Sequence, residues 1–120
     1  MVRAICQREY GLLGSNIVIN RAGSGFKLRV RNLKSLSLIL GEHTTSPLVS
    51  IGVSVDYQEF VTANVTAGLN NIPVSSFLND KEMDTNVIRI NAEGWQNNRV
   101  NLESIVLNAV RIFYFVYYDS

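Results

Sequence analysis

The dominant feature of this chain is an alternation of apolar and polar residues. In residues 26–31 the apolar side chains occupy every second position, and cations occupy the positions between them. Residues 35–40 and 49–56 repeat the alternation, the latter with β-branched side chains on one face and small or polar ones on the other. A period of two is that of a β-strand with one buried face, so each segment is predicted to be a strand.

Further segments complete the predicted set. Residues 86–92 and 102–107 are predicted strands, whereas residues 59–66 and 71–77 show weaker patterns. Pro73 restricts the last of these to a sheet edge or a strand start, because proline has no backbone donor for the ladder. Short strands separated by turns indicate an antiparallel sandwich or barrel. We predict an all-β fold, an antiparallel β-sandwich of about seven to nine strands, in a single domain.

The same alternation predicts the core. The side chains expected to face inward are those of Phe26, Leu28, Val30, Leu36, Leu38, Ile51, Val53, Val55, Ile88, Ile90, Ile105 and Leu107. Gly23, Ser24 and Gly25 are predicted to form the tight turn into the first of these strands. A phosphate cradle is not expected there, because no helix follows the glycines.

Residues 110–118 differ in kind from the rest. The last ten residues hold five of the chain's ten Phe and Tyr residues, without a clear alternation of polar and apolar side chains. Two interpretations remain open. The segment is either an inner strand buried on both faces, or an exposed edge through which two copies form a homodimer.

Charge and hydropathy exclude several classes of partner. Eleven basic and ten acidic residues give a net charge of +1, which lacks the basic excess of a nucleic-acid-binding protein. Lys27, Arg29 and Arg31 are interpreted as the solvated face of one strand, because no aromatic platform accompanies them. No apolar run reaches the roughly 18 residues of a membrane span, and no apolar segment of a secretory signal is visible.

Candidate catalytic and metal-ligating chemistry is sparse. Cys6 and His43 are the single cysteine and histidine, so neither an internal disulfide nor a zinc site of the usual ligand count is expected. Ser15 lies in Gly-Ser-Asn rather than in a nucleophile elbow, and His43 lies in a polar run that resembles an exposed loop. The glutamates Glu59, Glu82, Glu93 and Glu103 are scattered. We predict no catalytic residues, no metal and no cofactor, and therefore no enzyme.

Residues 94–99 are the most conspicuous turn, because one tryptophan is followed by amides and a cation. In a structural interpretation, Trp95 covers the end of the sandwich and the asparagines supply turn conformations. In a binding interpretation, Trp95 stacks against a sugar ring and Gln96, Asn97, Asn98 and Arg99 bind its hydroxyls. The structural interpretation is favoured, because a single tryptophan in an all-β loop more often fills a corner.

Asn64, Val65 and Thr66 form an N-glycosylation sequon, which makes Asn64 a candidate glycosylation site. A motif this short arises often by chance. It therefore supports secretion only weakly.

Four segments occur in a distinctive order, namely GSGFKLRVRN, LKSLSLILG, IGVSVDY and NVIRINAEGWQNNRVNLESIVLN. Their order resembles the jelly-roll, galactose-binding-like domain that precedes the catalytic domain in SGNH-type carbohydrate esterases, family 2 carbohydrate esterases above all. The resemblance covers about residues 20–108 and leaves residues 109–120 as an atypical aromatic segment. Tyr57 departs from the family pattern, since it stands where the family has a hairpin glycine.

The resemblance implies a non-catalytic accessory domain. In the family, a Gly-Asp-Ser block with the catalytic serine follows the position of residues 107–108, and this chain has no counterpart of it. The implied partners are an SGNH catalytic domain or a polysaccharide, and the implied location is extracellular. Two alternatives stay open, which are a free-standing carbohydrate-binding module and a structural or truncated product without independent activity.

Overall fold

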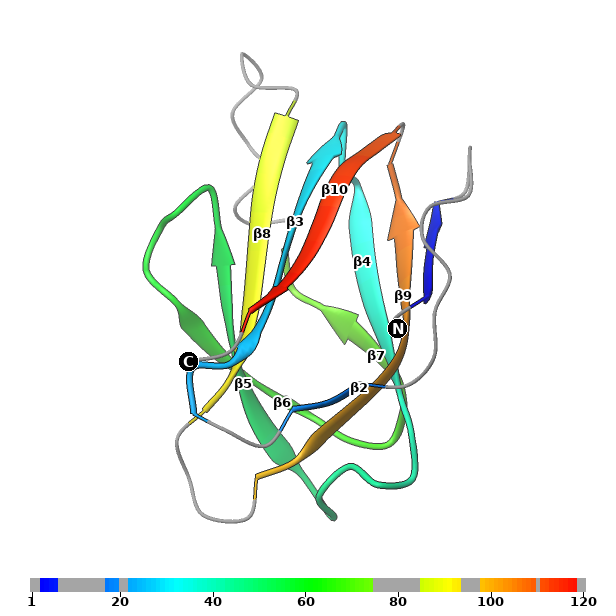
Figure 1. Ribbon diagram of the computed structural model, residues 1–120, viewed down its shortest axis with the longest axis vertical. Coiled ribbons are helices and arrows are strands. Elements are labelled where there is room, and N and C mark those ends of the chain that lie inside the picture. Colours follow the sequence, from blue (N-terminus) through cyan, green and yellow to red (C-terminus); the bar gives the residue numbers. More distant parts are fainter. Residues whose placement is uncertain are drawn as a thin grey trace.

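The computed structural model describes residues 3–6, 17–19, 22–74, 85–93, 98–109 and 111–118. Ten strands lie in these residues and form two five-stranded sheets, which pack face to face (Figure 1). Sheet A contains β1 (Arg3–Cys6), β2 (Ile17–Ile19), β4 (Ser35–Leu40), β7 (Gly68–Ile72) and β9 (Val100–Asn108). Sheet B contains β3 (Gly25–Arg31), β5 (Val49–Val55), β6 (Val61–Val65), β8 (Thr85–Ala92) and β10 (Arg111–Tyr118). The predicted β-sandwich is confirmed.

The strand order is that of a jelly roll. The chain crosses repeatedly between the sheets, so that β2–β9–β4–β7 faces β3–β8–β5–β6, and β10 extends sheet B beyond β3. All pairs are antiparallel except β1 with β9, which is parallel. β1 and β2 pair with the same edge of β9. β2 lies against Val100 to Leu102, and β1 lies against Ser104 to Leu107. Neither of these short strands has a pattern that predicted it.

The core lies between the two sheets and follows the alternation. Every side chain predicted to face inward is buried there. In β8 the burial alternates residue by residue, whereas in β5 the outward-facing Gly52 and Ser54 are buried as well. Other side chains of the protein therefore cover the outer face of sheet B at β5.

One predicted strand differs from the observed one. Of the segment predicted at residues 71–77, residues 71 and 72 belong to β7, Gly68–Ile72, and Pro73 follows directly after it, whereas residues 75–77 lie outside the described residues. β7 is an edge strand, as the proline requires. The prediction missed residues 68–70 because glycine and asparagine have low β propensity. In the structure, Gly68 has a φ of 101°, and the side chain of Asn70 forms hydrogen bonds with the backbone of Thr66 and Gly68.

β10 is an edge strand, and the inner-strand interpretation of residues 112–118 is wrong. It pairs with β3 alone among the described strands, and none of its residues is fully buried. The pairing runs from Arg111 opposite Arg31 to Tyr118 opposite Gly25. Phe115 faces the core and stacks on Phe26 with ring centroids 5.3 Å apart. The aromatic side chains of β10 therefore divide between the core face and the exposed outer face of the strand, so the strand is not buried on both faces.

We expect the two phenylalanines of β10 to differ sharply in their contribution to stability. Replacing Phe115 by alanine should cost about 3 kcal/mol, because it leaves a cavity beside Phe26. Replacing Phe113, which is 44% exposed, should cost less than about 1 kcal/mol. Urea unfolding followed by circular dichroism measures both, and equal losses would show that β10 is not packed on the core.

The homodimer through β10 stays a prediction. Among the described residues, the outer edge of β10 has no strand partner, and Val116 and Tyr117 are exposed beside Phe113. Sedimentation equilibrium at several concentrations measures the association. A monomer at high concentration would count against it.

Candidate functional site

A hollow lies on the outer face of sheet B, and the register of the strands creates it. One cross-strand row places Val116, Lys27, Arg89 and Ser54 side by side from β10 to β5. The adjacent row is Tyr118, Gly25, Asn91 and Gly52. Glycines therefore flank Asn91 on both sides, and the space beside Gly52 is filled by the side chains of Asn91 and Phe60.

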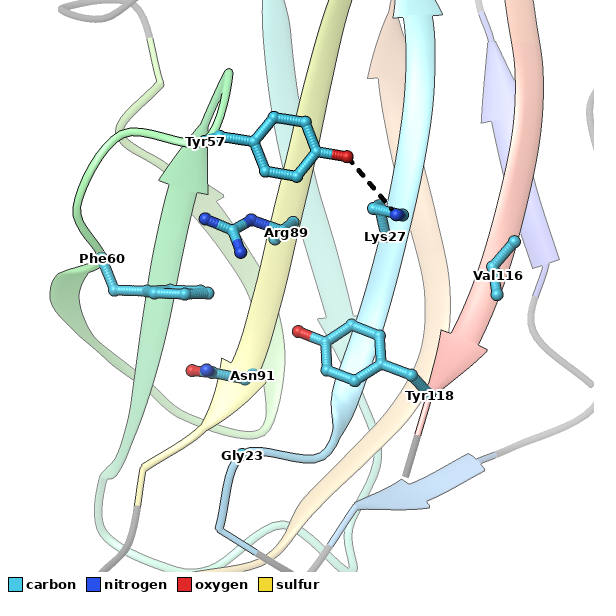
Figure 2. Close-up of a pocket in the computed structure, with 8 residues that line it drawn as sticks. All are labelled: Gly23, Lys27, Tyr57, Phe60, Arg89, Asn91, Val116 and Tyr118. Carbon is cyan, nitrogen blue, oxygen red and sulfur yellow. Dashed lines mark hydrogen bonds between the residues drawn. The ribbon is translucent and has the colours of Figure 1, made fainter. Parts of the chain in front are cut away.

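The hollow has a volume of about 420 Å³, which falls in the lower part of the range for small-ligand sites. Side chains from three strands and one loop converge on it (Figure 2). The larger ones are those of Lys27, Tyr57, Phe60, Arg89, Asn91 and Tyr118.

Arg89 is held between two aromatic rings. Its guanidinium carbon lies 4.7 Å from the ring centre of Tyr57 and 4.7 Å from that of Phe60 (Figure 2). Its Nη2 also donates a hydrogen bond of 2.9 Å to Oγ of the buried Ser54. Cation–π contacts and a charge-assisted hydrogen bond thus fix the orientation of the guanidinium.

Tyr57 reaches this position through an unusual turn. Asp56 and Tyr57 have φ values of 54° and 61°, and Gln58 N–H donates to Val55 C=O, as in a type I′ turn. A positive φ is strained for an aromatic residue. Asp56 offsets the strain by anchoring the turn to β8, because its carboxylate accepts hydrogen bonds of 2.8 Å from Asn86 Nδ2 and 2.9 Å from Val87 N–H. The side chain of Tyr57 thereby forms one wall of the hollow.

Tyr118 and Lys27 form the opposite side. The hydroxyl of Tyr118 points across the hollow toward β8 (Figure 2). Burial raises the pKa of Tyr118, although the charges of Arg89 and Lys27 oppose the shift. The phenol therefore stays protonated at neutral pH and can donate a hydrogen bond. Lys27 Nζ lies 3.4 Å from the hydroxyl of Tyr57.

Two polar atoms of the residues that line the hollow are buried without a hydrogen-bond partner among the described residues. They are Nε of Arg89, a donor, and Oδ1 of Asn91, an acceptor. Both are shielded from solvent beneath the lining, and Oδ1 of Asn91 lies over Gly52. The unmade hydrogen bonds therefore cost stability, about 1–3 kcal/mol for a buried polar group, and are not contacts that a ligand in the hollow reaches.

The residues predicted as a sugar site do not account for this hollow. Trp95, Gln96 and Asn97 lie outside the described residues. Asn98 is half-buried and Arg99 is exposed. The backbone of Arg99 is bonded in both directions to Thr45, since its N–H donates to Thr45 Oγ1 and its C=O accepts from Thr45 N–H.

The other candidate residues lie apart from the hollow. Asn64 is exposed on the edge strand β6, and its Oδ1 accepts a hydrogen bond of 3.0 Å from Ser50 Oγ. His43 is exposed in the loop between β4 and β5, as predicted. The described residues contain no group of three His, Cys, Asp or Glu side chains that could hold a metal ion. They also contain no helix capable of spanning a bilayer.

Sequence reasoning missed the hollow because it treated Lys27 as part of a solvated face. Arg29 and Arg31 are exposed, but Lys27 is half-buried beside Tyr57. One signal was available. Gly52 and Ser54 are small outward-facing residues in a β-branched strand, and Tyr57 and Phe60 follow that strand closely. Small residues beneath nearby aromatics indicate a covered outer face.

Gly52 supplies a direct test of the geometry. A side chain there would collide with Oδ1 of Asn91 and press on Phe60. We expect Gly52→Val to displace the side chain of Asn91 and to lower the affinity of the hollow for any ligand at least tenfold. Valine suits a strand, so the cost in stability should stay below about 2 kcal/mol. Ser50→Val, on the same face of β5, is the matched control, and an equal effect of both variants on binding would contradict this geometry.

Comparisons of the chain with protein-family models, with curated proteins and with solved structures find no match.

Proposed function

We propose that this domain is a non-catalytic carbohydrate-binding module, and that the hollow on sheet B is its sugar site. The observation that carries the proposal is a hollow whose lining combines aromatic rings with amide and cationic side chains. A sugar ring presents apolar C–H faces and a rim of hydroxyls that both donate and accept. It can therefore satisfy a donor and an acceptor at once while its faces contact aromatic rings.

The chemistry of the lining supports binding over catalysis. The eight described residues that line the hollow include no carboxylate, serine, cysteine or histidine. A Ser–His or Cys–His pair and a pair of catalytic carboxylates would each need these groups. The rigid placement of Arg89 and Tyr57 favours binding further, because a prepared site loses little entropy on association.

The test is calorimetric titration with neutral and acidic oligosaccharides and with soluble xylan and glucomannan. Asn91→Ala should abolish measurable binding and change the free energy of unfolding by less than about 1 kcal/mol, because Oδ1 has no partner to lose. Asn71→Ala, on sheet A, is the matched control and should bind as the parent does. The proposal fails if no carbohydrate binds, or if both variants lose binding equally.

A second candidate is an accessory domain of an SGNH-type carbohydrate esterase, the role implied by the galactose-binding-like resemblance. The observation that favours it is the exposed apolar side chains of Phe113 and Val116 on the outer face of β10, which a neighbouring domain could cover. The chain alone should not hydrolyse 4-nitrophenyl acetate or acetylxylan. Turnover that disappears on His43→Ala would contradict both candidates.

A further inference from the structure

We propose that the hollow selects sugars that carry a carboxylate, that is, uronic acid units of an acidic polysaccharide. The inference rests on the proposed function and names its ligand class. Two features of the hollow support it. Its lining carries positive charge without negative charge, and it offers more hydrogen-bond donors than acceptors.

The hollow holds two cations and no anion. Lys27 and Arg89 both line it, and none of its eight described lining residues is acidic. Two acidic side chains on neighbouring elements are engaged elsewhere: Asp56 bonds to Asn86 and to the N–H of Val87, and Glu93 accepts a hydrogen bond of 2.8 Å from Thr62 Oγ1. Glu59, in the same loop as Tyr57 and Phe60, is exposed and does not line the hollow. Among the described lining residues, the positive charge therefore has no carboxylate to neutralise it.

Donors outnumber acceptors at the point where the cations meet. Lys27 Nζ carries three protons, and its one hydrogen-bond partner among the described residues is the hydroxyl of Tyr57 at 3.4 Å. The Tyr118 hydroxyl is a further donor and lies within electrostatic reach of both cations. A carboxylate accepts several such bonds at once, whereas a hydroxyl offers fewer and weaker ones.

Asn91 explains why the anion should belong to a sugar. Its side-chain amide lines the hollow and suits hydroxyls, which a bare carboxylate lacks. A uronic acid carries hydroxyls beside its carboxylate and so can serve both the amide and the cations. The apolar faces of its ring can contact Phe60 and Tyr118, which line the same hollow.

Single-stranded nucleic acid is the competing polyanion, since it also combines phosphates with stacking bases. Two observations disfavour it. Tyr57 and Phe60 each give one ring face to Arg89, and the whole chain has a net charge of +1 with a pI near 7.9. Nucleic-acid-binding domains are commonly far more basic.

The experiment compares each acid with its own ester. Oligosaccharides of galacturonate, glucuronate and mannuronate, and the fully methyl-esterified form of each, are titrated by calorimetry into the full chain. Esterification removes the charge and keeps the ring and its hydroxyls. At least one acid should bind tenfold or more tightly than its ester, and its affinity should fall as salt rises. Lys27→Gln should reduce the acid-to-ester ratio to below about threefold, a loss typical of one charged hydrogen bond.

Lys34→Gln is the matched control, because Lys34 is an exposed lysine in the loop after β3, and it should preserve the ratio. If acids and esters bind equally well, the carboxylate inference fails and the proposed function stands. If no sugar of either kind binds, both fail. Tighter binding of a single-stranded oligonucleotide than of any acid would also overturn the inference.

Discussion

Replacing Val53 with aspartate should leave the domain largely unfolded at room temperature. Val53 is 1% exposed in the centre of β5, between Ile90 on β8 and Val61 on β6. The change removes a packed side chain and buries a carboxylate that has no cation within the core. We expect a loss of at least about 4 kcal/mol, against the 5–15 kcal/mol that stabilise a typical domain. Urea unfolding followed by circular dichroism measures the loss.

Val61 provides the matched control. It is the cross-strand partner of Val53 but is 44% exposed on β6. The same substitution there should cost no more than about 1 kcal/mol, the range of β-propensity effects. Similar losses at both positions would contradict the inward assignment of Val53 and with it the predicted core.

Replacing Arg89 with methionine should abolish sugar binding, with a loss of at least a hundredfold. Methionine can still fill the space between Tyr57 and Phe60, but it removes the charge, the Nε donor and the hydrogen bond to Ser54. Stability should fall by about 2 kcal/mol, since two cation–π contacts and one charged hydrogen bond are lost and only partly replaced by packing. Calorimetric titration and urea unfolding measure the two effects separately.

Arg29→Met distinguishes this effect from a general loss of charge. Arg29 is an exposed arginine on the neighbouring strand β3, and it also lies over an aromatic ring, that of Phe113 at 5.6 Å. Its replacement should change binding less than threefold and stability by less than about 0.5 kcal/mol. If both variants weaken binding equally, the outer face acts through diffuse charge and the hollow is not the site.

The core could be predicted because it depends on local sequence. In β5 and β8 each inward residue is followed by an outward one, so the period alone assigns Val53 and Ile90 to the interior. The short β2 escaped prediction, since three residues cannot show a period. β10 was ambiguous because its outward positions are aromatic too.

The hollow could not be predicted, because it depends on register between distant strands. Gly25 and Gly52 are far apart in sequence, and only pairing with β8 places them on either side of Asn91. The charge pattern correctly assigned Lys27 to the outer face. It could not indicate that the loop after β5 would fold Tyr57 back over that face, since this requires positive φ at two non-glycine residues.

The most direct test of the sugar site observes the side chains of Arg89 and Asn91. The Nε–H of Arg89 and the Nδ2 amide of Asn91 both give resolvable signals in a proton–nitrogen NMR correlation spectrum. Titration with a uronic acid oligosaccharide should shift both signals in a saturable way, with the midpoint at the calorimetric affinity, because both side chains line the hollow that the ligand fills. Binding that leaves both signals unmoved, with changes confined to sheet A or to other loops, would contradict the assignment of the hollow as the sugar site.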